Sequence, residues 1–160
     1  FALNNEMDDF LTRRGEANAF GLAHAELNRP APGKRPLSSM TPTIVWDPAA
    51  GEGGSMRLIV GGAGGPRSIS GSAQAALNVL LFNMPAHNAV AAPRFHHQWQ
   101  PDTLQLETAL ITPALEADLK AKGHTTSTRK SVGNITLIRA KDNAWDAASD
   151  PRKGGVPAGY

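Results

Sequence analysis

The strongest constraint in the sequence is a glycine-rich stretch, Gly61–Gly65, in which only Ala63 is not glycine. The residues Met56–Val60, apolar except for Arg57, precede it and predict a strand, and apolar residues recur at helical spacing from Ser68 to Phe82. A strand that turns into a helix in this way presents open backbone N–H groups at the helix N-terminus. Such groups bind phosphate, carboxylate or a developing oxyanion. The stretch therefore predicts an anion-binding loop, and the simpler alternative is a tight strand-to-helix turn.

Two familiar glycine motifs do not fit this stretch. In the dinucleotide-binding pattern, Gly62-x-Gly64-x-x-Gly, the third glycine position is occupied by Arg67. A phosphate-binding loop would continue with Gly-Lys-Ser or Gly-Lys-Thr, whereas Pro66 follows Gly65 here. The sequence therefore offers no support for a nucleotide-binding domain.

Composition narrows the classes of protein further. The 160 residues include 16 glycines and 12 prolines, which predicts short elements and many turns. Cysteine is absent, which excludes disulfide scaffolds, zinc–thiolate sites and thiol catalysis. The net charge of +2 is small and the basic residues are scattered, so we expect no nucleic-acid partner. No apolar run approaches the ~18 residues of a membrane span.

The order of predicted elements indicates the fold class. Strands and helices alternate without the regular rhythm of βαβ units, so we expect an α+β or layered α/β fold. Pro85 is expected to open the second helix and Thr112 to cap the third, whereas glycine and proline predict a long loop over 13–34. Residues 103–107 alternate and predict a strand with one solvated face. The predicted strands are 43–46, 56–60, 103–107, 134–139 and one within 145–160, and the predicted helices are 68–82, 85–92 and 113–122.

Three carboxylates lie close together near the start of the chain: Glu6, Asp8 and Asp9. Glu6 and Asp9 are three residues apart, so on a helical turn they converge on one point. Such a pair suits a substrate ammonium group, a metal ion, or acid and base catalysis. Asp8 points away from the shared face and is expected to be structural. The alternative for the whole segment is an acidic surface turn.

Adjacent serines, Ser38 and Ser39, offer two hydroxyl donors that would suit a substrate carboxylate. Serines are equally common in turns and caps, and no Gly-x-Ser-x-Gly elbow surrounds either of them. The five histidines show no metal-ligand spacing. We therefore expect no metal site and interpret Phe95–Trp99, with adjacent His96 and His97, as a segment for packing and hydrogen bonding.

The order of these motifs resembles the γ-glutamyltransferase (γ-glutamyltranspeptidase, glutathione hydrolase) family, and the matches extend nearly from end to end. Each motif is weak by itself, but their succession is too long for coincidence. The matching segments are Asn4–Phe10, Pro32–Met40, Pro42–Ile44, Gly64-Gly65, Ala92–Trp99, Asp150–Arg152 and Gly159-Tyr160.

The resemblance implies an N-terminal nucleophile hydrolase with a four-layer αββα sandwich. Members of the family are made as a precursor that cuts itself into a large and a small subunit. The new N-terminal Thr of the small subunit is the nucleophile, and its own α-amino group serves as the base. The γ-glutamyl group of glutathione, or of another γ-glutamyl amide, forms an acyl-enzyme that water or an amino-acid or peptide amine resolves. No cofactor is implied.

The resemblance also assigns roles to the weak motifs. Glu6 and Asp9 match positions that hold the α-ammonium of the γ-glutamyl group, and Ser38 and Ser39 match positions that bind its α-carboxylate. Gly64 and Gly65 match the oxyanion hole. The loop over 13–34 lies where some members carry a lid over the pocket.

Two departures from the family pattern matter. Where members usually read Gly-Ser-Pro-Gly-Gly-Ser, this chain has Gly61–Pro66; Pro66 keeps both glycine N–H groups but is expected to restrict Gly65 to extended conformations. The chain also opens at Phe1, and Thr12, Thr41 and Thr43 are internal and lack a free α-amino group. We therefore expect residues 1–160 to be the C-terminal portion of the small subunit, with the nucleophile upstream, and to be inactive without the large subunit from the same precursor.

Two other functions remain open. A related acylase would act on another amide, such as a glutaryl group, although a glutaryl group has no α-amine for Glu6 and Asp9 to hold. A non-catalytic amino-acid-binding module would need no nucleophile. The family resemblance favours a periplasmic or secreted, outward-facing protein.

Overall fold

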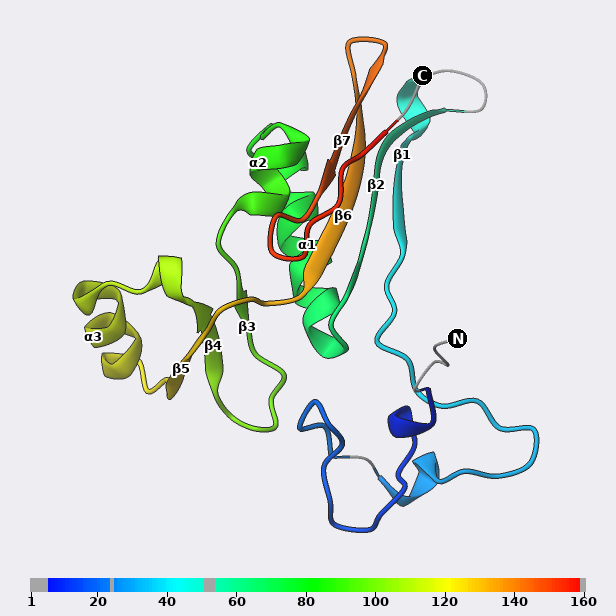
Figure 1. Ribbon diagram of the computed structural model, residues 1–160, viewed down its shortest axis with the longest axis vertical. Helices are drawn as coiled ribbons and strands as arrows, with labels where there is room; N and C mark the ends of the chain where they lie inside the picture. Colours follow the sequence, from blue (N-terminus) through cyan, green and yellow to red (C-terminus); the bar gives the residue numbers. More distant parts are fainter. Residues whose placement is uncertain (1–5, 24, 51–53, 159–160) are drawn as a thin grey trace.

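The computed structural model describes residues 6–23, 25–50 and 54–158 (Figure 1). Among these residues, no helix combines the length and the apolar character that crossing a membrane requires. The strands are β1 Thr43–Asp47, β2 Ser55–Ala63, β3 Phe95–His96, β4 Leu104–Glu107, β5 Thr126–Arg129, β6 Asn134–Lys141 and β7 Ala144–Ser149. The α-helices are α1 Pro66–Leu80, α2 Ala86–Ala91 and α3 Pro113–Ala121, and the 3-10 helices are η1 Glu6–Asp9, η2 Glu26–Asn28, η3 Pro48–Ala50 and η4 Thr108–Leu110.

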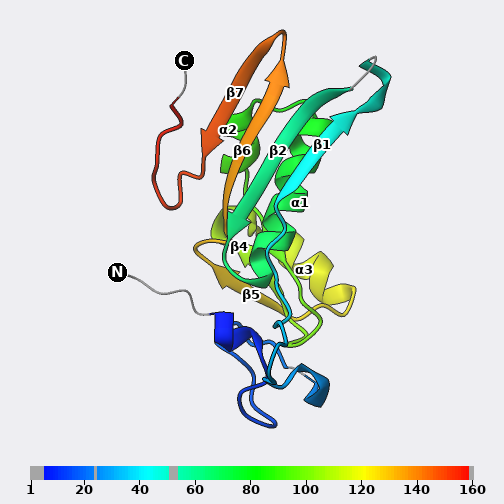
Figure 2. The same cartoon turned by 90° about the vertical axis from the view of Figure 1, so that its right-hand side faces the viewer.

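The main sheet has the order β1-β2-β6-β7 and is antiparallel throughout. Helices α1 and α2 lie against one of its faces (Figure 2). A smaller sheet, β3-β4-β5, combines an antiparallel and a parallel pair and carries α3 at its side. The fold is α+β, as the alternation of elements predicted. The core between the main sheet and the helices consists of Leu58, Val60, Ala75, Val79, Ala86, Ala89, Val90, Ile135, Leu137 and Ala148.

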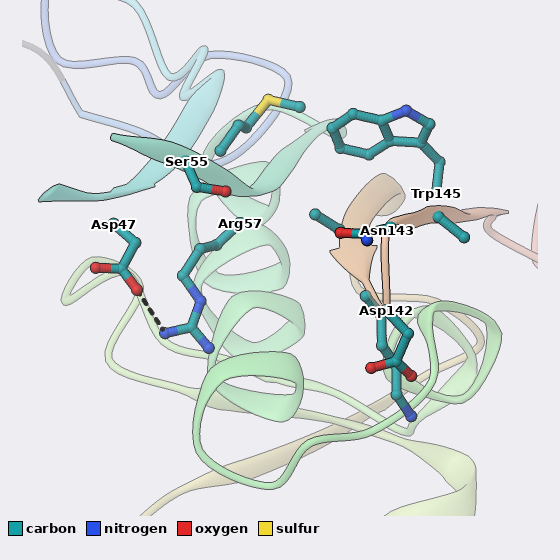
Figure 3. A pocket seen from close by; sticks show the side chains of 10 residues that line it. Asp47, Ser55, Arg57, Asp142, Asn143 and Trp145 are labelled. Carbon is teal, nitrogen blue, oxygen red and sulfur yellow. Dashed lines mark ion pairs between the residues drawn. The ribbon is translucent and has the colours of Figure 1, made fainter. Parts of the chain in front are cut away.

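The opposite face of the main sheet is apolar and largely uncovered by described residues. Ile44, Ile59, Ile138 and Ala147 are cross-strand partners in one row across the four strands, and Ile44 is 65% exposed. At the hairpin end of the sheet, exposed Trp145 borders a hollow together with the Asp47–Arg57 ion pair and Asn143 (Figure 3). Large exposed apolar faces of this kind are typical of surfaces that another layer covers.

Strand β2 is longer than the sequence predicted. The glycines were expected to break the strand at Gly61, but β2 runs through Gly62 to Ala63, and Gly62 pairs with Ile135 of β6. A Cβ at Gly62 would lie 2.6 Å from the carbonyl oxygen of Asn134, so the glycine permits a close strand contact. The turn begins only at Gly64.

Helix α1 forms where it was predicted, but its buried face is made of small residues. Ser72, Ala75 and Val79 are among its buried side chains, whereas Leu77 and Leu80, part of the helical apolar pattern, are exposed. A Cβ at Gly71 would lie 2.7 Å from Ile135, which shows how closely the helix approaches the sheet. The small residues allow this approach, and the larger apolar residues therefore face outward.

Two further expectations need correction. Strand β4 was predicted to have a solvated face, yet both Gln105 and Glu107 on that face are buried, because each accepts hydrogen bonds from arginine side chains. Pro85 precedes α2 as its N-cap residue instead of opening the helix.

The predicted Thr112 cap of α3 is confirmed, since its hydroxyl accepts from Leu115 N–H at 3.1 Å. Strands β3 and β5 were not predicted; both are short.

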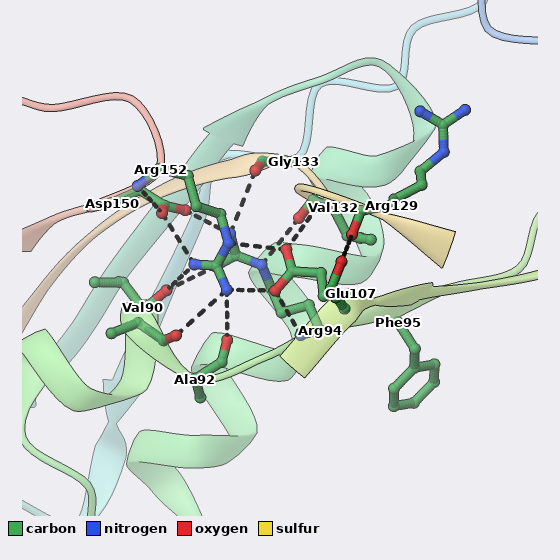
Figure 4. Close-up of polar contacts among 12 residues, drawn as sticks. Val90, Ala92, Arg94, Phe95, Glu107, Arg129, Val132, Gly133, Asp150 and Arg152 are labelled. Carbon is green, nitrogen blue, oxygen red and sulfur yellow. Dashed lines mark hydrogen bonds and ion pairs between the residues drawn. The ribbon is translucent and has the colours of Figure 1, made fainter. Parts of the chain in front are cut away.

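Buried charges join the two sheets to the C-terminal segment (Figure 4). Arg94, which is 1% exposed, donates to Asp150 at 2.5 Å and to the carbonyl oxygens of Val90 and Val132. Arg152 donates to both Glu107 and Asp150. Burial raises the pKa of Asp150, but hydrogen bonds from the backbone N–H groups of Arg152 and Ile135 and from both guanidinium groups outweigh it, so the pKa of Asp150 is lowered.

Removing one charge from this network should destabilise the protein strongly. We expect Asp150→Asn to lower the free energy of unfolding by about 3–5 kcal/mol, because it leaves the buried Arg94 guanidinium without its counter-charge. Chemical denaturation measures the change. Asp118→Asn is the matched control, since Asp118 forms an exposed pair with Lys122 and its loss should cost less than about 0.5 kcal/mol. A similar small loss for both variants would contradict the prediction.

Candidate functional site

The glycine turn presents two backbone N–H groups at the start of α1. Gly64 has φ 130° and Gly65 has φ 58° and ψ −134°, and Pro66 is the first residue of the helix. Among the described residues, no carbonyl accepts a hydrogen bond from the N–H of Gly64 or Gly65. Two adjacent open donors at a helix N-terminus match the anion-binding loop that the sequence predicted, and a developing oxyanion is a ligand they suit.

Gly65 has an extended backbone, as the following proline predicted, but its φ and ψ angles have the opposite signs to those of an ordinary extended residue. Its angles are close to the mirror image of polyproline II, a conformation that is essentially restricted to glycine. A Cβ at Gly65 would also lie 2.8 Å from the ring of Phe20. The position therefore requires glycine both for its backbone angles and for the aromatic ring beside it.

One hydroxyl joins the glycine turn to the serine pair. The buried Ser68, on the first turn of α1, has its Oγ within 3.0 Å of the Ser39 carbonyl oxygen and 2.6 Å of the Gly65 carbonyl oxygen. Ser38 Oγ accepts from the Met40 N–H at 3.2 Å, as in a turn, and so keeps its own O–H free to donate. The structure thus brings Ser38-Ser39 and Gly64-Gly65 to one place. Ser68 was not singled out from the sequence.

The acidic segment forms the single 3-10 turn η1. Asp8 has the structural role that was predicted, because its carboxylate accepts from the Ala19 N–H at 3.2 Å. Asn28 Nδ2 donates to the Asp9 carbonyl oxygen at 2.7 Å, and Asn18 Nδ2 donates to that of Asp8 at 3.3 Å. Among the described residues, no donor contacts the half-buried Asp9 carboxylate. It therefore remains open to a cationic ligand.

The loop over 13–34 connects η1 to the glycine turn. It contains η2 and a turn in which Asn18 Oδ1 accepts from the N–H groups of Phe20 and Leu22. The ring of Phe20 then lies against Gly65, and the Arg67 guanidinium is 5.8 Å from the centre of that ring. Asp8, Asn18 and Phe20 thus form a continuous connection between the acidic turn and the glycine turn.

The surroundings of Gly64 are cationic. A cavity of about 370 Å³ opens beside it, and Arg67, Arg129 and Lys153 lie in its wall. Burial and the charge of Arg129 lower the pKa of Arg67. Such surroundings favour a negative charge at the glycine turn. The remaining wall residues are Ala63, Ser131, Gly133, Asn134 and Arg152.

His96 is buried beside this site and is fully hydrogen-bonded, as expected for a packing residue. Its Nδ1 lies 2.7 Å from Ser70 Oγ and its Nε2 lies 2.8 Å from Gln98 Oε1. Burial lowers the pKa of His96; the bond to Gln98 opposes this effect, and the charges of Arg67, His97 and Arg129 add to it. Within the described residues, no three His, Asp or Glu side chains are placed to hold a metal ion.

Some sequence motifs lie outside the described residues. These are Asn4 and Asn5 before η1, His24 in the loop, and Gly159-Tyr160 at the end of the chain.

The whole chain, residues 1–160, matches the γ-glutamyltranspeptidase family. The chain belongs to this family. It is 42% identical over 159 residues to a glutathione hydrolase proenzyme of Pseudomonas aeruginosa, covering 98% of this chain and 28% of that protein. The Escherichia coli glutathione hydrolase proenzyme is 38% identical over 160 residues, covering 99% and 27%. The chain thus spans little more than a quarter of the length of these relatives.

Solved structures agree with the sequence match. The γ-glutamyltranspeptidase of Pseudomonas nitroreducens superposes with a TM-score of 0.85 at 40% identity, covering 100% of this chain and 82% of that one. The fold is therefore that of the γ-glutamyltranspeptidases, which are N-terminal nucleophile hydrolases, as the motif order implied.

The lowered pKa of His96 predicts a pH dependence of stability. The unfolded chain takes up a proton at His96 near pH 6.5, whereas the folded chain does so only at lower pH. Between the pKa of His96 in the folded chain and that in the unfolded chain, the unfolded state binds more protons. Stability should therefore fall as the pH drops below about 6.5. Thermal unfolding between pH 5 and pH 8 measures the slope, and His96→Gln should reduce it. His87→Gln, at an exposed position on α2, is the control. Identical slopes for the wild type and His96→Gln would contradict the prediction.

Proposed function

We propose that this chain supplies the γ-glutamyl-binding residues and the oxyanion hole for γ-glutamyl transfer and hydrolysis. The donor is glutathione or another γ-glutamyl amide, and the reaction passes through a γ-glutamyl-Thr acyl-enzyme. The observation that carries this proposal is the contact of Ser68 with both Ser39 and Gly65, because it unites a carboxylate-binding pair with two open N–H donors. The relatives' name, glutathione hydrolase, supports the same substrate class.

The oxyanion hole consists of the Gly64 and Gly65 N–H groups. When the nucleophile attacks the γ-carbonyl carbon, the carbonyl oxygen gains negative charge, and two preorganised donors stabilise that charge more than they stabilise the neutral amide. The cations Arg67 and Arg129 beside the turn add a positive potential.

The two ends of the γ-glutamyl group are held by different segments. The hydroxyls of Ser38 and Ser39 donate to the α-carboxylate, and Ser68 keeps the Ser39 backbone in place for that contact. Glu6 and Asp9 accept from the α-ammonium; the Asp9 carboxylate has no described donor and is suited to this role. Holding both ends fixes the γ-carbonyl at the glycine turn.

The nucleophilic Thr and the large subunit complete the site. The Thr is supplied from outside these 160 residues, and its α-amino group takes the proton from its own hydroxyl during attack. The amine of the donor leaves as the acyl-enzyme forms, and water or an acceptor amine then releases the γ-glutamyl group. The uncovered apolar face of the main sheet, with Ile44 and Trp145, suits packing against a second sheet of an αββα sandwich.

A substitution at Asp9 distinguishes γ-glutamyl from glutaryl substrates. In the processed, complete protein, Asp9→Ala should lower kcat/KM for γ-glutamyl-p-nitroanilide by about 10- to 100-fold, because a charged hydrogen bond to the ammonium is lost. Hydrolysis of glutaryl-p-nitroanilide, which has no ammonium, should not fall. Glu16→Gln, at an exposed residue of the loop, is the control. Equal losses for the two anilides would contradict the role of Asp9 in holding the α-ammonium.

A substitution at Gly65 tests the oxyanion hole. Gly65→Ala forces the backbone away from φ 58°, so its N–H loses its direction and kcat should fall by roughly 10²- to 10³-fold with little change in KM. Steady-state kinetics on processed protein measures both constants. Gly33→Ala is the matched control, because Gly33 also has a positive φ but open space around it. A rise in KM with unchanged kcat would assign Gly65 to ground-state binding instead.

A further inference from the structure

We infer that His96 is a positioning residue for the oxyanion hole: it holds the loop that carries Phe20 against Gly65 through a directional chain of hydrogen bonds from Ser70. This inference rests on the proposed function, because it concerns the same glycine turn. The chain of bonds is Ser70 to His96, His96 to Gln98, and Gln98 to the carbonyl oxygen of Phe20.

The direction of each bond follows from the Gln98 side chain. Its Nε2 lies 3.0 Å from the carbonyl oxygens of both Phe20 and Gln100, so the amide nitrogen is the end that faces these acceptors. Its Oε1 therefore faces His96, and an amide oxygen only accepts. Hence His96 Nε2 carries the proton, His96 Nδ1 carries the lone pair, and Ser70 O–H is the donor to it. His96 and Gln98 thus each accept a hydrogen bond on one side and donate one on the other, whereas Ser70 is the donor that begins the series.

The series of hydrogen bonds ends at Phe20, whose backbone is held on both its N–H and its carbonyl side. The Phe20 N–H donates to Asn18 Oδ1 at 3.0 Å, and the Phe20 carbonyl accepts from Gln98 at 3.0 Å. With its backbone held in this way, the Phe20 ring lies beside Gly65, where a Cβ would meet three of its carbon atoms at 2.8 Å. The loop segment and the segment after β3 lie side by side below α1 (Figure 1). Release of Phe20 would free one side of the Gly65 turn.

A direct chemical role for His96 does not fit this geometry. The residue is 2% exposed and both ring nitrogens are occupied, so it has no nitrogen available for a substrate. Its partner Ser70 directs its hydroxyl at His96 and lies on α1 one turn after the glycine turn. Ser70 and His96 thus act through Gln98 and Phe20 on the loop.

Gln98→Glu tests this inference with little change in shape. A carboxylate at 98 still accepts from His96, but it presents an acceptor to the Phe20 and Gln100 carbonyls and repels them. In the processed, complete protein we expect kcat for γ-glutamyl-p-nitroanilide to fall by about 10- to 100-fold, with KM within about twofold. The reason is that misplacement of the Gly65 turn affects the geometry of the reaction. Hydrogen exchange of residues 13–34 should rise, and trypsin should cleave faster after Arg13 and Arg14, whereas exchange in β2 and β6 should not change.

Variants of Ser70 complete the experiment. Ser70→Ala removes the hydroxyl and should also reduce kcat. Ser70→Thr keeps an O–H and should retain most of the wild-type kcat. His87→Gln, at an exposed position of α2, should match the wild type in both kcat and exchange.

The outcomes separate this inference from the proposed function. If the processed wild-type protein does not hydrolyse the γ-glutamyl anilide, the proposed function fails. Hydrogen exchange of residues 13–34 in Gln98→Glu still decides whether the hydrogen bonds from Ser70 through His96 and Gln98 hold the loop. If the wild type is active and Gln98→Glu equals it in kcat and exchange, the inference is overturned. If exchange rises throughout the chain and Tm falls in parallel with kcat, His96 has a purely structural role and the inference is likewise overturned.

Discussion

The buried pairing of Arg94 with Asp150 is the interaction on which the arrangement of the chain depends. Neither charge is exposed to water, so each requires the other, and their hydrogen bonds connect the end of α2, the start of β6 and the C-terminal segment. Arg152 and Glu107 extend the connection to β4. A buried ion pair of this kind contributes little net stability compared with apolar residues, but it admits few alternative arrangements. It thereby fixes the small sheet relative to the main sheet.

That fixed arrangement positions the candidate site. Strand β3 begins directly after Arg94; His96 at its end and Gln98 in the segment after it reach the loop that packs on Gly65. On the other side, Ser68 of α1 holds Ser39 at the same turn. The glycine turn is therefore supported by contacts from three segments that are far apart in the sequence. A backbone conformation that only glycine adopts persists there because its neighbours are held by packing and hydrogen bonds.

Local sequence patterns predicted much of the fold. The strand at Thr43, the helix that follows the glycine turn and the Thr112 cap carry local sequence signals, and they formed where they were expected. Expectations failed where the outcome depended on distant partners. The buried face of α1 is made of small residues because the sheet lies so close, and Glu107 is buried because Arg152, 45 residues away, neutralises it.

The sequence by itself determined the family, the types of the longer elements and the site residues to examine, because motif order and short-range spacing are properties of the chain alone. Only the tertiary structure decided how these residues meet. Ser68 and Phe20 carry no local signal, since serine and phenylalanine in such contexts are common, and Gln98 was marked only as part of the Phe95–Trp99 segment. Their importance comes from contacts across 29 residues in the first case and 78 in the last, which place a hydroxyl, a ring and an amide around one glycine turn. Such convergence depends on how the strands and helices pack, and packing is settled only when the whole core forms.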